Sequence, residues 1–430
     1  MAQMQNAQTV ALQLEKVRDK LPLLYERDDM LLTMIQQRGD VERVSSRNMR
    51  LPLQIRPGGK SGLANMDGGD LGRGSGTSYE VAQVTPVFFR DAVEITKLVE
   101  YAGNAPEKAI ENAAKREVKN AMAQFRSFLD KVMNTAGNGV LGTVSSLNGN
   151  TVRLAKPPGA ALFYYNQTVQ FYDPTLTINR NVAAGVQTNV TGVDVFGGQL
   201  DSTSTLPQIT VDQLPAGVGA NDVIVHDGLV GANPVSLFGI LYHQTNATTG
   251  SWLNLNRPTY AVELATPNVN AANSAIVPAF VRLAINKVRK ALGNNQLGKL
   301  VAYTSLEQEH AWEQIGVTIS QIIKEGGSKR ANDLDLLFTG EKTMAGVPIK
   351  TSINANYSRV DFLDLSHWGR AVMQDIDYYE VGGNTVFPIY GASGGLATAY
   401  IFYFFTGFQV WNDSPRSGAY ISSLALPSGY

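Results

Sequence analysis

The sequence predicts an α+β fold in which a β-rich module interrupts a mixed helix-and-sheet domain. A long amphipathic helical pattern covers residues 105–133. It is followed by residues 139–265, a tract that is poor in charge and rich in Gly, Asn, Thr and Val. Helical periodicity then returns at Ser274. A change from helical to β patterning and back again indicates that one domain is inserted into another.

The composition limits the classes of protein that the chain can belong to. Its 430 residues are enough for two or three domains, each with a core of its own. Charged residues make up 17%, against about 25% in an average globular protein, which favours large contact surfaces or much β structure. The net charge of −1 excludes a strong overall attraction to nucleic acid or to an anionic membrane. The absence of cysteine excludes disulfides, thiolate nucleophiles and thiolate metal sites.

No segment of the sequence predicts secretion or a membrane span. Residues 1–30 carry Glu15, Lys16, Arg18 and Asp19, where a signal peptide would need an uninterrupted apolar core. The longest apolar stretch, residues 397–410, is too short to cross a bilayer. We therefore expect a protein that is made inside the cell and has no membrane partner.

The N-terminal part predicts a helical arm followed by an extended hairpin. Residues 10–38 carry an apolar helical stripe that Pro22 interrupts, and the stripe fits either docked core or a partner-binding arm. Residues 50–55 and 79–89 alternate like strands around a glycine-dense loop at 57–76. Loops longer than about 15 residues are uncommon unless they bind something or a neighbour orders them.

The helix predicted at residues 105–133 would be about 43 Å long at 1.5 Å per residue. Pro106 lies in its first turn, and Gly137 is expected to end it. Short β runs then predict a small barrel or sandwich; they cover residues 151–154, 168–171, 208–211 and 222–225.

Two further helices are predicted at residues 274–292 and 305–324, and the second opens with the capping-box spacing Ser305-Leu-Glu-Gln308. The remaining predicted elements are strands, at residues 347–353, 360–365, 371–381, 399–410 and 419–426.

The strongest enzymatic motif is Gly391-Ala-Ser393-Gly-Gly395, which matches the G-x-S-x-G pattern of serine hydrolases. A nucleophile elbow needs a helix after the serine and a histidine later in the chain. Here a predicted strand follows, and no histidine lies beyond His367. A glycine-rich turn is therefore favoured, and a hydrolase that uses Ser393 remains the weakest alternative.

Other polar motifs also favour structural interpretations. His310 and Glu313 lie one helical turn apart, but the chain lacks the H-E-x-x-H metal motif. Gly72, Gly74 and Gly76 are not followed by the residues that close a phosphate loop. We predict no catalytic, cofactor or metal site.

Basic residues recur through the N-terminal region, either as a solvated loop or as a strip that faces a polyanion or an acidic partner; they are Arg38, Arg43, Arg47, Arg50, Arg56 and Lys60.

The order of these parts resembles that of tailed-bacteriophage major capsid proteins, whose shell fold is shared with encapsulins. The resemblance covers most of the chain, and none of its local motifs has strict chemical spacing. Four segments resemble the family locally: KLVAYTS at 299–305, MAGVPIK at 344–350, DFLDLSHWG at 361–369 and PIYGASG at 388–394.

The resemblance implies five parts. They are an N-terminal helical arm (1–48), an extended-loop hairpin (49–90), a peripheral domain with a spine helix (91–138), a β-rich insertion domain (139–266), and an axial domain with returning peripheral strands (267–430). The segment before Val41 is too short for the scaffolding segment that some family members cut away, so the resemblance implies that either a separate scaffold or the arm itself guides assembly.

The function that the resemblance implies is structural. The chain would assemble as hexamers and pentamers into an icosahedral shell around the double-stranded DNA of a tailed phage, in the virion after assembly in the host cytoplasm. Its implied partners are other copies of itself, a scaffolding protein, a portal protein, a decoration protein and packaged DNA. An encapsulin-like compartment is the alternative.

The family's extended loop lies over a neighbouring subunit, which makes its polar residues candidates for contacts between subunits. These candidates are Arg50, Arg56, Lys60, Asp67, Asp70 and Arg73. Some family members crosslink subunits through a lysine of this loop. Lys60 lies in the corresponding loop, but the crosslinking asparagine and glutamate have no match in this chain, and that chemistry is not carried over.

Overall fold

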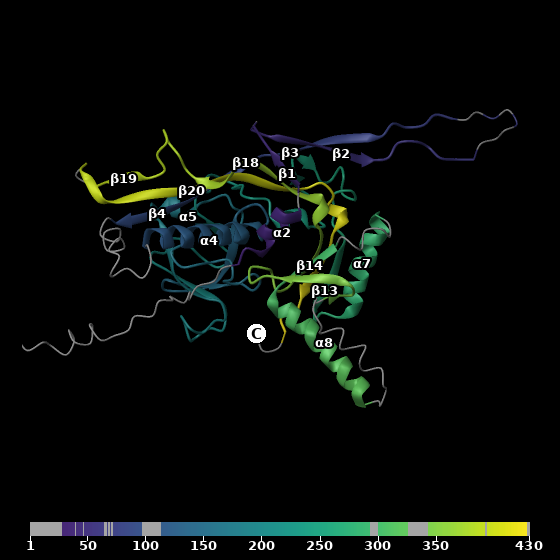
Figure 1. Cartoon of the computed structure of the whole chain (residues 1–430). Coiled ribbons are helices and arrows are strands. Elements are labelled where there is room, and N and C mark those ends of the chain that lie inside the picture. Colours follow the sequence, from purple (N-terminus) through teal and green to yellow (C-terminus); the bar gives the residue numbers. More distant parts are fainter. Residues whose placement is uncertain are drawn as a thin grey trace, which may run out of the picture. The chain divides into compact units, whose positions relative to one another are not determined.

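The computed structural model describes residues 28–38, 40–45, 47–63, 67, 69, 72–96, 113–292, 300–325, 343–391 and 394–427 (Figure 1). The described residues form two compact units. One comprises those between 91 and 124 and between 379 and 403, and the other comprises the rest. The predicted helical stripe before residue 28, with Pro22, lies outside the described residues; helix α2, Met30–Arg38, is its described end.

The hairpin consists of β2 (Met49–Arg56) and β3 (Ser78–Val84), which pair antiparallel with Met49 opposite Val84. The prediction of a single strand at 79–89 is wrong, because β3 ends at Val84 and a new strand, β4 (Val87–Thr96), begins after Pro86. Proline has a fixed φ and no N–H for a ladder hydrogen bond, so it separates the two strands.

The long helix α4 is described from Ala113 to Met133; residues 105–112 of the predicted helix lie outside the described part. Phe125, Leu129 and Val132 are buried, as the spacing of three and four predicts. The chain turns away at Gly137, which adopts a φ of +86°. Glycine is favoured there because side chains with a Cβ atom rarely adopt positive φ.

The tract after α4 contains a closed six-stranded barrel in the order β10-β5-β6-β9-β8-β7, which agrees with the predicted barrel or sandwich. The sequence predicted four of its strands and missed β5 and β8. The bounds are β5 Val140–Asn148, β6 Thr151–Leu154, β7 Thr168–Tyr172, β8 Thr188–Asp194, β9 Gln208–Val211 and β10 Val223–His226. One apolar cluster, which includes Val152, Phe171 and Ile209, fills the barrel.

The segment after the barrel contains the short elements α6 (Ile240–His243), β11 (Ser251–Trp252) and β12 (Leu255–Asn256). Trp252 and Leu264 are buried together with residues of the hairpin. This segment therefore packs against β2 and β3 and not into the barrel core.

A six-stranded sheet in the order β13-β21-β17-β14-β16-β15 forms a second core beneath α7 and α8. Its elements are β13 Asn268–Ser274, α7 Pro278–Leu292, β14 Leu300–Thr304, α8 Leu306–Glu325, β15 Thr343–Met344, β16 Val347–Thr351, β17 Val360–Asp364 and β21 Ala419–Leu424. The predicted helix start at Ser274 is wrong, since residues 268–274 form β13 and the helix begins at Pro278, where proline is favoured.

The predicted capping box is half formed. Ser305 Oγ accepts from the Gln308 N–H at 3.5 Å. The Gln308 side chain does not return to Ser305, because its Nε2 donates to the carbonyl oxygens of Tyr357 and Ala425 at 2.8 and 2.9 Å. Gln308 therefore joins the start of α8 to two loops of the sheet.

The remaining sheet contains β1 (Asp40–Arg43), β18 (Trp368–Tyr378), β19 (Phe387–Tyr390) and β20 (Leu396–Asn412). Phe402, Phe404, Phe408 and Trp411 are buried, so much of the aromatic run in β20 is core. Among the described helices, none is long and apolar enough to cross a membrane.

Candidate assembly surface

The hairpin has one face buried in its own chain and one face exposed. Met49, Leu53, Ala82 and Val84 are buried in an apolar cluster with Trp252 and Leu264. Because side chains alternate along a strand, the intervening residues lie on the opposite face; these are Arg50, Pro52, Gln54, Tyr79, Val81 and Gln83, and Tyr79 and Val81 remain 66% and 48% exposed. The ladder shifts register between Gln54 and Arg56, and Arg56 pairs with Ser78, which is in phase with the inner residues. Exposed apolar side chains beside a cation are suited to contact with another protein.

A set of polar contacts fixes the loop end of the hairpin ladder to the segment after the barrel. Arg56 Nε donates to Glu263 Oε1 at 2.6 Å, and its guanidinium lies 5.8 Å from the centre of the Tyr260 ring. The Tyr260 hydroxyl donates to Glu80 on the neighbouring strand. The hydrogen bond from Arg56 lowers the pKa of Glu263. Arg56 is thus held within its own chain, and it orients the hairpin.

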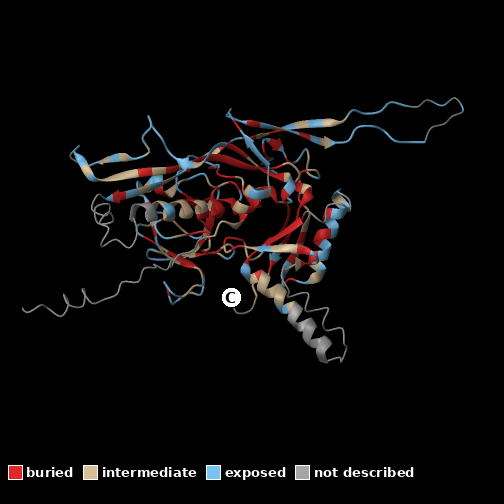
Figure 2. Ribbon diagram, viewed as in Figure 1, coloured by how far each residue is buried: buried red, intermediate tan, exposed pale blue. Residues whose placement is uncertain are grey.

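The tip of the hairpin makes few contacts with the rest of the chain. The described residues from Pro57 to Gly76 are all exposed (Figure 2). Gly59 and Ser75 close the neck of the loop, where the Gly59 N–H donates to the Ser75 carbonyl oxygen at 2.7 Å. Leu63 beyond them is fully exposed.

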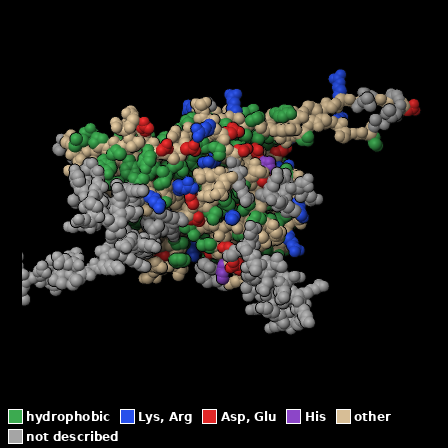
Figure 3. Space-filling view, viewed as in Figure 1, with side chains coloured by type: hydrophobic (Ala, Val, Ile, Leu, Met, Phe, Trp, Pro, Cys, Tyr) green, Lys and Arg blue, Asp and Glu red, His purple; other side chains and the backbone are tan. Residues whose placement is uncertain are grey.

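The structure does not gather the five described candidate contact residues into one site. Lys60, Asp67 and Arg73 lie on the exposed tip, and Arg50 lies on the outer face of the ladder. Asp70 lies outside the described residues. Figure 3 shows basic and acidic side chains distributed over this face of the molecule with hydrophobic side chains between them. On the described part of this face, side chains of both signs are interspersed, unlike the single-sign surface that attracts a polyanion.

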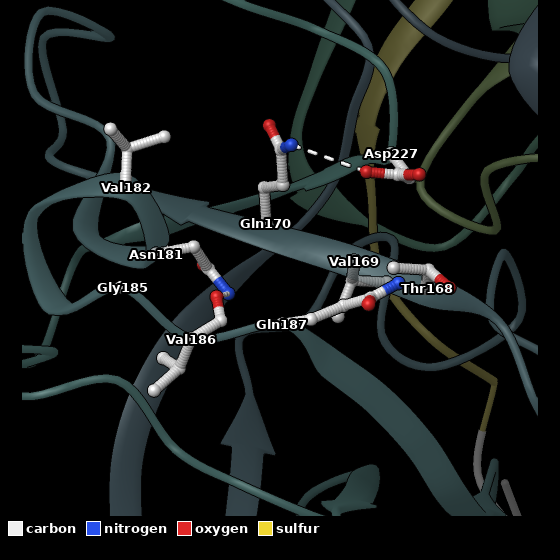
Figure 4. Close-up of a pocket in the computed structure, with 9 residues that line it drawn as sticks. All are labelled: Thr168, Val169, Gln170, Asn181, Val182, Gly185, Val186, Gln187 and Asp227. Atoms are coloured by element: carbon white, nitrogen blue, oxygen red, sulfur yellow. Dashed lines mark hydrogen bonds between the residues drawn. The ribbon is translucent and has the colours of Figure 1, made fainter. Parts of the chain in front are cut away.

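The barrel carries a shallow cleft of about 280 Å³ beside β7. The β7–β8 ladder ends at the pair Val169 and Thr188, and beyond it the Phe171 N–H donates to Asn181 Oδ1 at 2.7 Å. In Figure 4 the Gln170 side chain points toward Asp227, to which its Nε2 donates at 3.2 Å. Asp227 is the one charged residue that lines the cleft. The cleft therefore offers no pair of groups for acid–base or nucleophilic chemistry.

The described residues around Ser393 do not form a nucleophile elbow. Ser393 itself lies outside the described residues. Gly391 accepts from Gly394 and donates to Gly395 in a turn that joins β19 directly to β20. A strand follows the motif where the elbow requires a helix.

A serine–histidine pair that the sequence did not predict lies in the module. His226 Nε2 is 2.6 Å from Ser236 Oγ, and Nδ1 is 2.9 Å from the carbonyl oxygen of Asp227. Both side chains are buried, and Phe89 and Phe128 pack around the imidazole. Burial lowers the pKa of His226. The pair has no carboxylate on Nδ1 and no open face for a substrate, so it is a packed hydrogen bond of the core.

The predicted helix face with His310 carries local contacts, including one between the Gln314 and His310 side chains at 2.9 Å. Within the described part of the chain, no group of three or more His, Asp and Glu side chains is placed to hold a metal ion.

No protein-family model matches this chain, and no curated protein sequence matches it. The three-dimensional structure does match solved structures. A chain of the capsid asymmetric unit of cyanophage A-1(L) aligns over 97% of this chain and 98% of that chain, with a TM-score of 0.57 and 12% sequence identity. The chain has the fold of a phage capsid protein. At this identity the likeness is one of fold.

Two further capsid-fold structures align over almost the whole chain. The capsid of Myoviridae phage XM1 gives a TM-score of 0.49 at 8% identity, covering 99% of this chain and 100% of that chain. The SrpI encapsulin of Synechococcus elongatus gives 0.47 at 7% identity, covering 99% of both. The match to the cyanophage capsid chain confirms the α+β prediction and the resemblance to the capsid shell fold.

Proposed function

We propose that this chain is the major capsid protein of a tailed phage, which assembles as hexamers and pentamers into an icosahedral shell around double-stranded DNA. The observation that supports this most directly is the hairpin. On a chain with a capsid fold, its inner face is fixed in the subunit while its outer face and tip are exposed. Heterologous contacts of this kind close into rings and shells when every copy repeats them.

The hairpin suits this role because its ladder and its tip differ in how firmly they are held. Arg56, Tyr260 and Glu263 fix the loop end of the ladder and so set its direction. Tyr79 and Val81 would supply apolar contact to the neighbouring subunit, with Arg50 beside them. Lys60, Asp67, Asp70 and Arg73 at the tip would make the polar contacts. Aromatic and arginine side chains are the residues that most often dominate such interfaces.

The remaining partners belong to the same proposal. A separate scaffolding protein would guide assembly in the host cytoplasm, a portal protein would occupy one vertex of the virion, and a decoration protein would bind the finished shell. A wall with a net charge of −1 encloses DNA without binding it strongly. The barrel, within the insertion domain proposed at 139–266, would brace the subunit or its neighbours from outside.

Electron microscopy of the expressed chain, with its scaffold where required, tests the proposal. Closed shells or capsomers are expected. The double variant Tyr79→Asp, Val81→Asp should fold and remain unassembled, because it places charge on the outer face of the ladder. Val182→Asp, at an exposed apolar position on the barrel, is the matched control and should assemble.

A wild-type chain that stays monomeric under all assembly conditions would overturn the proposal. Equal assembly of the two variants would remove the assigned role of the hairpin. Shells that take up a protein cargo and exclude DNA would support the encapsulin-like alternative.

A further inference from the structure

A single buried carboxylate joins three separate segments of the chain. Asp130 on α4 is fully buried. Its Oδ1 accepts from the Leu32 N–H at 2.9 Å, and its Oδ2 accepts from Asn354 Nδ2 at 2.7 Å. Leu32 lies in the first turn of α2, and Asn354 lies in the loop after β16. Asp130 therefore bonds to an otherwise unsatisfied N–H at the start of α2 and ties that helix to α4 and the sheet.

The charged groups that face Asp130 from the α2 segment are two more carboxylates. Asp28 accepts from Ser352 Oγ at 2.6 Å, from the Ile353 N–H at 3.0 Å and from the Met30 N–H at 3.2 Å. Asp29 accepts from Arg126 Nε at 2.8 Å. Because both acids are negatively charged, they disfavour the ionisation of Asp130.

The titratable groups on the other elements do not neutralise Asp130 either. Arg126, one turn earlier on α4, is engaged by Asp29. Lys131 directs its Nζ to the carbonyl oxygens of Ala161 and Phe163. On the sheet, the Tyr303 hydroxyl donates to Asn134 Oδ1 at 2.9 Å. Burial raises the pKa of Tyr303, and the negative charge of Asp130 adds to this effect. The described hydrogen-bond partners of Asp130 are thus all uncharged.

Burial raises the pKa of Asp130 to about 7, and the charges of Asp28 and Asp29 add to this effect. The hydrogen bonds from Leu32 and Asn354 act in the opposite direction and are outweighed. An isolated carboxylate removed from water is costly, so the group takes up a proton near neutral pH.

The neighbouring amide can accommodate both states of the carboxyl group. Asn354 Oδ1 is buried without a hydrogen-bond partner, while Nδ2 donates to the ionised Asp130. A half-turn of the amide exchanges Oδ1 and Nδ2. The carbonyl oxygen then occupies the position 2.7 Å from Asp130 Oδ2 and accepts the hydrogen of the neutral carboxyl group. The longer bond from Nδ2 to the Asp28 carbonyl oxygen, at 3.4 Å, is lost in the exchange.

We propose that Asp130 is a pH-sensitive anchor for helix α2: its neutral form holds the first turn of α2 against α4 and the β16 loop, and its ionisation weakens that contact. The inference concerns the folded subunit and does not depend on the proposed shell function.

The direction of the effect follows from proton linkage. When α2 is docked, Asp130 binds a proton more tightly than in the open state, where its pKa returns to about 4. Docking is therefore strongest below about pH 4, weakens as the pH rises toward 7, and levels off above it. With a docked pKa of about 7, opening of α2 should increase about tenfold between pH 6 and pH 8.

Hydrogen exchange of the intact protein measures this opening. The protection factors of residues 28–38 are measured at pH 6, 7 and 8 and corrected for the intrinsic exchange rate. In the wild type they should fall about tenfold between pH 6 and pH 8. In Asp130→Asn the dependence on pH should disappear, because the amide has nearly the same shape and does not titrate. Strand β9 should show no such dependence in either protein and serves as the internal reference.

Asp29→Asn is the matched control. It removes the ion pair with Arg126 and should lower the protection of α2 at every pH. A smaller decrease between pH 6 and pH 8 should remain, because burial is the largest cause of the raised pKa of Asp130 and the charge of Asp29 only adds to it. Equal pH dependence in the wild type and Asp130→Asn would overturn the proposal. If Asp130→Asn does not fold, the wild type decides: constant protection of residues 28–38 from pH 6 to pH 8 also overturns it.

Discussion

Lys131 donates from Nζ to the carbonyl oxygen of Ala161 at 2.9 Å, so the long helix α4 places an ammonium group in the loop after β6 of the barrel. The same Nζ donates to Phe163 at 2.9 Å and lies 5.8 Å from the centre of the Tyr164 ring. Lys131 is only 1% exposed. This buried cation joins the barrel to the helix that precedes it.

Lys131→Met should destabilise this junction. Methionine keeps the length of the side chain but leaves two buried carbonyl oxygens without a donor, at about 1–3 kcal/mol for each. Thermal unfolding should occur at a lower temperature, and amide exchange at residues 160–164 should increase. Lys287→Met removes an exposed lysine that donates to Asn268 and is the control. Equal effects of the two substitutions would contradict the assigned role of burial.

The barrel should fold as an independent domain. Its first and last strands are neighbours, with Val225 opposite Val140 and the His226 N–H donating to the Gly139 carbonyl oxygen at 3.3 Å. Its core is closed on itself. A fragment of residues 138–228 should therefore show β-type circular dichroism and a cooperative unfolding transition. A fragment without a cooperative transition would show that the barrel needs the rest of the chain.

Glu263→Gln should loosen the hairpin with little effect on global stability. The pair with Arg56 is partly solvated, since the two side chains are 54% and 19% exposed, and such pairs contribute less than about 1 kcal/mol. Amide exchange in β2 should increase because the loop end of the ladder loses its ion pair. Asp375→Asn breaks the ion pair with Arg43, which is more exposed than the pair of Arg56 with Glu263, and should leave amide exchange in β2 unchanged.

Acid should destabilise the fold through His243. This buried imidazole accepts from Trp252 Nε1 at Nδ1 and donates from Nε2 to the Val410 carbonyl oxygen, at 3.3 and 3.2 Å. Protonation of Nδ1 would turn it into a donor that faces the Trp252 Nε1–H donor. Burial lowers the pKa of His243 to about 3.

The unfolded chain then binds a proton near pH 6.5 that the folded chain binds only near pH 3, so stability is lost as the pH falls between these values. Urea unfolding should show a loss approaching 1.4 kcal/mol for each pH unit from this group. His243→Gln should show a smaller dependence on acid. An unchanged dependence would assign the effect to other groups.

Gly239→Ala should be strongly destabilising. A Cβ atom at this position would lie 2.2 Å from the Met133 carbonyl oxygen and 2.4 Å from that of Thr135, both of them backbone atoms at the end of α4. We expect a loss of at least about 2 kcal/mol in denaturant unfolding. Gly219→Ala is the control, because a Cβ atom there meets nothing within 4 Å, and its effect should stay within about 0.5 kcal/mol.

The sequence by itself determined the elements whose pattern is local. The alternation in β6 and β9, the apolar stripe of α4 and the glycine after it each lie within a few residues, and the structure has these elements where they were predicted. Prediction was wrong where a proline changed the element, at Pro86 and at Pro278. The hairpin and its exposed tip also followed from a local pattern of two alternating runs around glycines.

Only the tertiary structure decided which groups meet. Arg56 and Glu263 are 207 positions apart, and Asp130 and Asn354 are 224 apart. Local periodicity specifies which face of a helix or strand is apolar, but a polar contact depends on how several chain segments pack in space. For that reason the sequence placed Arg56 among contacts between subunits, whereas the fold holds it within the chain, and it gave no sign that Asp130 is buried without a cation.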